Sequence, residues 1–219
     1  MQYHWLNKAG NDSLIIFFSG WSFDYKPFEC IDCSGYDVFM YYNYVFLDEI
    51  LPDIFCEYKK ITLVSWSMGV FIAYYLRDKL PEFSEKIAIN GTPYPVDDTK
   101  GIPRKIFDLT LRYAETGLRE KFYINVFSNN KFLEKYLKNP IERNIKNRVE
   151  ELESLDKLIK STTFIYDDKF YTRALIGMDD KIIPPKNQLN CWKNKAVKLN
   201  CGHFPFYYFK NWDEILKCR

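Results

Sequence analysis

The sequence predicts an α/β fold in which helices flank both faces of a mostly parallel central sheet. Six short, predominantly apolar runs are typical of strands that are covered on both faces. These runs are Leu14–Phe18, Val38–Tyr42, Ile61–Trp66, Lys86–Asn90, Arg173–Gly177 and Ala196–Leu199. Between two of them, Met68–Leu80 repeats its apolar residues at helical spacing. Strands that alternate with helices in this way indicate a parallel sheet.

Length and charge narrow the class of protein further. A chain of 219 residues is long enough for one buried core and short for two full domains. The net charge of +2 argues against a nucleic-acid or membrane partner. Met1–Ser13 lacks the pattern of a signal peptide, and Leu14–Phe18 is far shorter than the ~20 residues that cross a bilayer. We therefore expect a monomeric cytoplasmic protein.

The six cysteines do not predict a metal site or a disulfide framework. Cytosolic thiols stay reduced, so paired cysteines are not expected in a chain of this kind. Cys30 and Cys33 form a C-x-x-C pattern, but no second pair with matching spacing follows. We expect neither a metal nor a cofactor.

One connection between two late strands is much longer than the others. About eighty residues separate Asn90 from Arg173, far more than a usual connection. The segment is polar and helix-like, above all in Lys131–Lys160, with a break or helix start at Pro140. We expect residues 91–170 to form a helical lid over an active site, with 1–90 and 171–219 as the core. The alternative is a surface excursion without function.

The stretch from Ile61 to Ala73 predicts the nucleophile. It runs from an apolar strand through a serine, Ser67, into a helix, which is the context of a nucleophile elbow in an α/β-hydrolase fold. In the motif G-x-S-x-G, Ser65 replaces the first glycine and Gly69 is the second. Serine is still small enough for the tight turn. The alternative is a serine that caps a helix.

A serine nucleophile needs a base, and the chain has two histidines. His4 precedes every predicted strand, where a surface or edge position is expected. His203 follows the last predicted strand through Gly202, which is where the histidine of this fold lies in the order serine, acid, histidine. We therefore expect His203 to be the general base of Ser67.

The acid is expected after the strand Arg173–Gly177, where Asp179 and Asp180 compete. At most one can accept the imidazole N–H, because adjacent side chains point in different directions; we favour Asp180. The oxyanion hole is expected to use the backbone N–H groups of Met68 and Trp21. The indole of Trp21 is expected to wall the acyl pocket.

Taken together, these residues resemble the BioG-type pimeloyl-acyl-carrier-protein methyl esterases of biotin synthesis. The motifs that carry the resemblance extend over nearly the whole chain and are Gly20-Trp21, Ser65-Trp-Ser-Met-Gly69, Asn90-Gly-Thr92, Asp97-Asp98 with Gly101-Ile-Pro103, Asp180-Lys-Ile and Gly202-His203. The resemblance implies hydrolysis of the methyl ester on a pimeloyl chain carried by acyl-carrier protein. The alternatives are a general small-molecule carboxylesterase, a thioesterase, or an inactive scaffold used for binding.

Local charge agrees with an acidic carrier protein as partner. Between Arg112 and Arg148 there are nine Lys and Arg against four Glu, a net charge of +5, while the rest of the chain carries −3. A basic surface would attract a strongly acidic carrier. The candidate carrier-binding residues are Arg112, Arg119, Arg143 and Arg148. The alternative is a solvated helical face of mixed charge.

Overall fold

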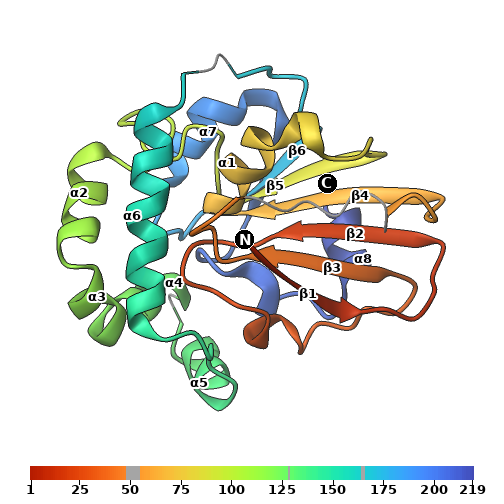
Figure 1. Cartoon of the computed structure of the whole chain (residues 1–219), viewed down its shortest axis with the longest axis horizontal. Coiled ribbons are helices and arrows are strands. Elements are labelled where there is room, and N and C mark those ends of the chain that lie inside the picture. The colour runs from red at the N-terminus through yellow and green to blue at the C-terminus, as the bar shows by residue number, and fades with distance from the viewer. Residues whose placement is uncertain (48–54, 128, 164–165) are drawn as a thin grey trace.

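In the computed structural model, which describes residues 1–47, 55–127, 129–163 and 166–219, seven strands form one sheet (Figure 1). They are β1 (Gln2–Asn7), β2 (Ser13–Phe18), β3 (Asp37–Tyr42), β4 (Lys60–Trp66), β5 (Glu85–Ile89), β6 (Arg173–Gly177) and β7 (Ala196–Leu199). Their order across the sheet is β1-β3-β2-β4-β5-β6-β7. Only β1 runs antiparallel to its neighbour, and every other pair in this sheet is parallel.

All six predicted strands are present, each within one residue of its predicted ends. The predicted helix is shorter than expected: α1 covers Met68–Tyr75, and Arg77–Lys79 forms a separate 3-10 turn. The sequence prediction missed β1, because an edge strand that is only half-buried lacks a continuous apolar run. His4 lies in this edge strand.

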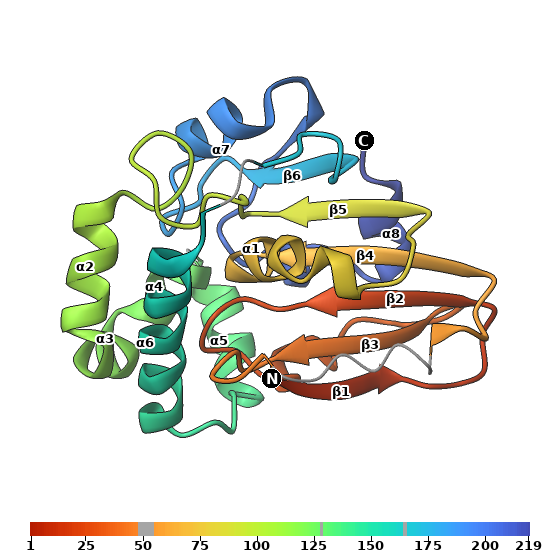
Figure 2. The ribbon, with the colours of Figure 1, turned by 45° about the horizontal axis from the view of Figure 1, so that its top comes forward.

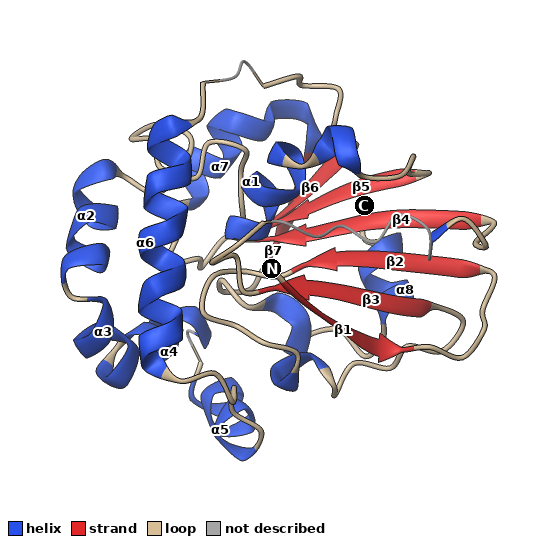
Figure 3. Ribbon diagram, viewed as in Figure 1, coloured by secondary structure: helices blue, strands red, loops and turns tan. Residues whose placement is uncertain are grey.

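The alternation of side chains along the strands divides the core into two layers. Ile16 and Phe18 of β2 pack into the layer that contains α1 and α7 (Pro185–Trp192). Ile15 and Phe17 pack into the layer that contains α8 (Trp212–Lys217). Figures 2 and 3 show α1 and α8 on opposite faces of the sheet. Burial of each such side chain stabilises the fold by about 1.5–3 kcal/mol, which explains why these strands read as apolar runs.

Five helices occupy the chain between β5 and β6 in the described residues. They are α2 (Arg104–Arg112), α3 (Ala114–Glu120), α4 (Phe122–Phe127), α5 (Asn130–Lys138) and α6 (Ile145–Ser161). The break expected at Pro140 falls in the connection between α5 and α6, and the side chain of Asn144 caps α6 by accepting from the backbone N–H of Asn147. Figure 1 shows the five helices beyond the carboxyl ends of the parallel strands.

The predicted division into core and insertion includes residues 48–54, 128 and 164–165, which lie outside the described residues. Among the helices of the described ranges, none combines the length and the hydrophobicity needed to cross a bilayer.

Candidate active site

Ser67 lies at the sharp turn between β4 and α1. Its backbone angles, φ 57° and ψ −125°, are strained for a residue with a side chain, and such strain costs on the order of 1–3 kcal/mol. Close packing holds the turn in place. A Cβ atom on Gly69 would lie 2.3 Å from the carbonyl oxygen of Phe18, and one on Gly91 would lie 2.4 Å from the carbonyl oxygen of Ser67. Glycine at these two positions therefore lets neighbouring backbone approach the elbow.

Ser65, which replaces the first glycine of the motif, is fully buried inside β4. Its partners across the sheet are Phe18 on β2 and Ala88 on β5. A small side chain therefore stands at this position of the elbow, as the sequence interpretation required.

The structure brings Ser67, His203 and Asp180 together. Ser67 Oγ lies 2.9 Å from His203 Nε2, and His203 Nδ1 lies 2.8 Å from Asp180 Oδ2. All three residues are buried, with exposures of 7%, 2% and 6%. A carboxylate can only accept hydrogen bonds, so these partners assign the imidazole proton to Nδ1 and leave Nε2 free to accept from the serine hydroxyl.

Further hydrogen bonds orient the carboxylate of Asp180. Its Oδ1 accepts from the backbone N–H groups of Ile182 (2.8 Å) and Ile183 (3.0 Å). Its Oδ2 accepts from Nε2 of Gln188 (2.9 Å) in addition to His203. Asp179, by contrast, has an exposed side chain. The structure thus places Asp180, and not its neighbour, against the imidazole.

Asn90 holds the histidine loop against the end of the sheet. Its side-chain amide donates to the carbonyls of Gly202 and His203, both at 2.9 Å, and its oxygen accepts from the N–H of Gly177 at 2.6 Å. Trp66 adds an indole hydrogen bond of 2.8 Å to the His203 carbonyl. Sequence reasoning assigned no role to Asn90 or Gln188. The position of Asn90 directly after β5 was the available signal, since polar side chains at strand ends face the site.

Trp21 and Met68, the expected oxyanion donors, both lie beside Ser67. They line a small space of about 20 Å³ together with Ser67 and His203. The loop after β2 is packed close to the elbow, because a Cβ atom on Gly20 would lie 3.0 Å from Cβ of Ser67. The Trp21 ring packs edge-on against Phe122, with ring centroids 4.8 Å apart.

A larger, mainly apolar cavity of about 310 Å³ extends from this space toward α2, α3 and α4. Five residues line both spaces and join them: Trp21, Met68, Ile102, Phe122 and Ile182. The arrangement can hold an apolar chain whose end reaches Ser67.

The four candidate arginines do not share one surface. Arg112 is exposed on α2, and Arg119 is exposed on α3 with its guanidinium 2.9 Å from Glu115. The Arg143 side chain is only 6% exposed, and Arg148 is 7% exposed. The expectation of an exposed basic surface is therefore wrong for Arg143 and Arg148. Their buried guanidinium groups donate hydrogen bonds inside the protein, from Arg143 to Glu151 and from Arg148 to Tyr123.

The cysteines are all free thiols. Burial raises the pKa of Cys201 to about 12, so this thiol near the histidine loop is not a nucleophile at neutral pH. Within the described residues, no three His, Cys, Asp or Glu side chains cluster in a way that could hold a metal ion.

A mostly parallel sheet defines an α/β-hydrolase of the serine type when a strained serine lies between strand and helix and is hydrogen-bonded to a histidine, which in turn is hydrogen-bonded to an aspartate. The model of the family "Pimeloyl-ACP methyl esterase BioG" matches residues 1–215. The chain therefore belongs to the BioG family.

Two individual relatives are also similar to this chain in sequence. A malonyl-[acyl-carrier protein] O-methyltransferase of Bacteroides fragilis is 32% identical over 197 residues, which cover 87% of this chain and 39% of that protein. The chain thus spans well under half the length of this relative. An uncharacterized protein of Haemophilus influenzae is 29% identical over 210 residues, covering 93% of this chain and 94% of that one.

Solved structures are similar as well. The crystal structure of BioG from Haemophilus influenzae matches with a TM-score of 0.86 at 28% identity, covering 97% of this chain and 98% of that chain. An esterase from Exiguobacterium antarcticum has a TM-score of 0.61 at 17% identity, covering 98% and 91%. An α/β-hydrolase fold protein from Burkholderia ambifaria has a TM-score of 0.61 at 13% identity, covering 98% and 90%. The last two show the fold alone.

Proposed function

We propose that the protein hydrolyses the methyl ester of a pimeloyl chain carried by acyl-carrier protein, a step of biotin synthesis. The observation that carries this proposal is the Ser67–His203–Asp180 array at the end of an apolar cavity in a chain of the BioG family. The array supports ester hydrolysis as the reaction, and membership of the BioG family supports the choice of substrate.

In the proposed reaction, Ser67 Oγ attacks the ester carbonyl carbon while its proton moves to Nε2 of His203. Asp180 stabilises the imidazolium. The N–H groups of Trp21 and Met68 stabilise the negative oxygen of the tetrahedral intermediate. The bond to the methoxy oxygen then breaks, and methanol leaves with the proton from His203. A water molecule deprotonated by His203 hydrolyses the acyl-serine, which frees the carboxylate and restores Ser67.

The cavity suits a substrate whose ester lies at the end remote from its carrier. When the methyl ester reaches Ser67, the chain must run through the apolar space between α2, α3 and α4 to the surface. Residues 91–170 would then act as the lid, with 1–90 and 171–219 as the core. The outer side of the cavity carries the exposed side chains of Ile106 (50%) and Tyr113 (57%).

The carrier would dock at this outer side. Lys121, between α3 and α4, is exposed and lines the cavity. Lys105 and Arg112 are exposed on α2 and line an adjoining groove, which shares Leu109 with the cavity. These three cations replace Arg143 and Arg148 as candidates, because a negatively charged partner can only reach exposed groups. Arg119 stays a candidate at the edge. The monomeric state and cytoplasmic location stay predictions.

The test compares three esters with the purified protein. They are the methyl ester of pimeloyl-acyl-carrier protein, free monomethyl pimelate, and a carrier-bound acyl thioester without the methyl group. We expect kcat/KM for the first to exceed that for the second by about 10²-fold or more, because remote contacts contribute to catalysis. We expect no cleavage of the third. Equal rates on the first two would indicate a general carboxylesterase, and release of free carrier thiol would indicate a thioesterase; Ser67→Ala controls for contaminating activity.

A further inference from the structure

The loop after β2, which carries Trp21, is hydrogen-bonded at four successive residues to the segment 142–151 of the helical insertion. The Trp21 indole donates to the Arg148 carbonyl (2.7 Å), and the Ser22 N–H donates to Glu151 Oε2 (3.0 Å). The Phe23 carbonyl accepts from Nη1 of Arg143 (3.1 Å), and Asp24 Oδ2 accepts from the N–H groups of Glu142 (2.7 Å) and Arg143 (3.2 Å). Each residue of the loop from Trp21 to Asp24 is thus held by a hydrogen bond to the helical insertion.

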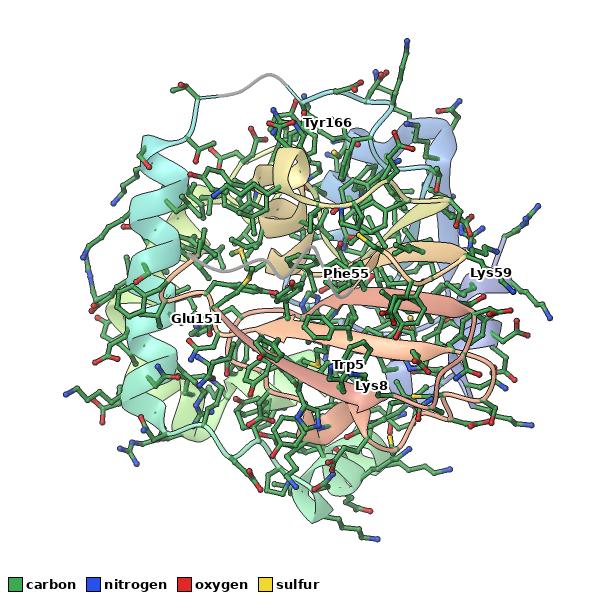
Figure 4. The ribbon with its side chains drawn as sticks, turned by 45° about the vertical axis from the view of Figure 1, so that its right-hand side comes forward. Trp5, Lys8, Phe55, Lys59, Glu151 and Tyr166 are labelled. Atoms are coloured by element: carbon green, nitrogen blue, oxygen red, sulfur yellow. The ribbon has the colours of Figure 1, made fainter. Side chains whose placement is uncertain are left out.

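Glu151 is the centre of this network. It is 0% exposed and lies on the side of α6 that faces the sheet (Figure 4). Its Oε2 accepts from Ser22 and, at 2.9 Å, from Nη1 of Arg143, while Oε1 accepts from the N–H of Tyr44 at 2.9 Å. One buried carboxylate thereby joins the loops that follow β2 and β3 to the helical insertion.

A buried ion pair is a weak source of stability, because desolvation offsets most of the attraction. Its local effect is on geometry: the carboxylate supplies acceptors for two loop N–H groups at fixed positions. Ser22 needs such support, since its φ of 77° is in the left-handed region that disfavours side chains. Its hydroxyl also bonds to Tyr123 at 2.6 Å, and Tyr123 accepts from Arg148 at 2.6 Å.

We infer that Glu151 and Arg143 are positioning residues, which hold the loop so that the Trp21 N–H points at the oxygen that becomes negative in the transition state. The inference rests on the proposed function, since it concerns the same serine chemistry. The Trp21 residue is fixed at both ends, by its indole on Arg148 and by the following peptide on Glu151. A donor aimed in advance stabilises the intermediate without reorganisation, so its loss lowers kcat more than it changes KM.

The test uses Glu151→Gln, with a small chromogenic ester and the carrier-bound methyl ester as substrates. The amide retains one acceptor oxygen but turns an N–H₂ group toward Arg143, Ser22 or Tyr44. We expect kcat to fall about 10- to 100-fold on both substrates, with KM changed less than about twofold. The matched control is Glu150→Gln, the same change on a half-exposed neighbour in α6, which should retain wild-type kcat.

Arg143→Lys is the second variant, in case Glu151→Gln does not fold. Lysine keeps the positive charge beside Glu151 but cannot donate at once to Glu151, the Phe23 carbonyl and Asn43 as arginine does. We expect a smaller fall in kcat, about 3- to 10-fold, again on both substrates. Thermal unfolding identifies which variants are folded at the assay temperature.

A folded variant at either position that retains kcat within twofold of wild type would overturn the inference. So would a change confined to KM. If the proposed function is wrong, the wild-type protein will cleave the chromogenic ester but not the carrier-bound methyl ester. The effect of Glu151→Gln on the chromogenic ester would still test the positioning role in that case.

Discussion

The carboxylate of Asp180 lies 2.8 Å from Nδ1 of His203, whereas the side chain of the adjacent Asp179 is exposed to solvent. We expect Asp180→Asn to lower kcat about 10⁴-fold, because an amide favours the wrong imidazole tautomer and does not stabilise the imidazolium. Asp179→Asn is the matched control and should retain wild-type activity. Steady-state kinetics with either ester measure kcat for both variants. A larger loss of kcat in Asp179→Asn than in Asp180→Asn would assign the acid to Asp179.

The nucleophile is tested by Ser67→Ala. Without the hydroxyl no acyl-enzyme forms, so ester hydrolysis should fall by several orders of magnitude while the protein stays folded. Labelling with a fluorophosphonate should disappear in the same variant, and mass spectrometry of the wild type should locate the label on Ser67. His203→Ala should cost nearly as much activity. Wild-type turnover by purified Ser67→Ala would exclude this mechanism.

Substitution by alanine should change the free energy of unfolding in opposite directions at two glycines, one in the elbow and one in α3. Gly69→Ala would place Cβ 2.3 Å from a backbone oxygen, so we expect a loss of about 3 kcal/mol or more in the free energy of unfolding. Gly117 lies in α3, where a Cβ atom would meet nothing within 4 Å. Gly117→Ala should instead stabilise the protein by about 0.5–1 kcal/mol, because alanine is the better helix residue. Urea unfolding measures both, and equal effects would contradict the described packing.

Reversal of charge at the outer side of the cavity should affect only the carrier-bound substrate. We expect KM for that ester to rise about 10-fold or more in a protein that combines Lys105→Glu, Arg112→Glu and Lys121→Glu. The reason is that all charges on a surface contribute to the electrostatic attraction that guides an acidic carrier to it. Added salt should weaken the wild-type reaction, given a Debye length of about 8 Å at physiological ionic strength.

The control for this prediction lies at the far end of the molecule. Figure 4 shows Lys59 away from the helical insertion, next to the start of β4 at Lys60. Lys59→Glu combined with Lys60→Glu should leave KM unchanged. Hydrolysis of a small uncharged ester should be normal in both proteins. Losses on both substrates would mean that the cavity itself had been damaged, and no loss would place the carrier elsewhere.

Asp37 predicts how stability depends on pH. Its side chain is buried, and burial by itself raises the pKa, but hydrogen bonds from Ala9, Asn11 and Tyr58 bring the pKa below its usual value of 3.8. A depressed folded-state pKa stabilises the fold above the unfolded value, and this contribution is lost as pH falls through the folded value.

Asp37→Asn removes that contribution. We expect a loss of about 2–3 kcal/mol at pH 7 and a shallower fall of the unfolding free energy as the pH is lowered from 7 to below the usual carboxyl pKa of 3.8. Urea unfolding across this pH range measures the slope. An unchanged slope would show that other carboxylates account for the acid sensitivity.

The sequence by itself determined six strands of the sheet, β2 to β7, and the elbow, but it missed the edge strand β1. Continuous apolar runs report burial on both faces, so the six runs from Leu14 to Leu199 located their strands within one residue. The elbow is equally local, because a strand, Ser67 and a helix follow one another within a few residues. The order of serine, acid and histidine along the chain then indicated His203.

Only the tertiary structure decided between groups that look alike in sequence. Asp179 and Asp180 differ in the direction of their side chains, which the turn after β6 sets. Arg143 and Arg148 differ from Arg112 in what packs around them. Glu151 carries no signal of its own in a charged helix, because its two loop partners come from residues more than a hundred positions away. The exposure of a side chain and the direction in which it points depend on how distant segments pack together. No short stretch of sequence determines that packing.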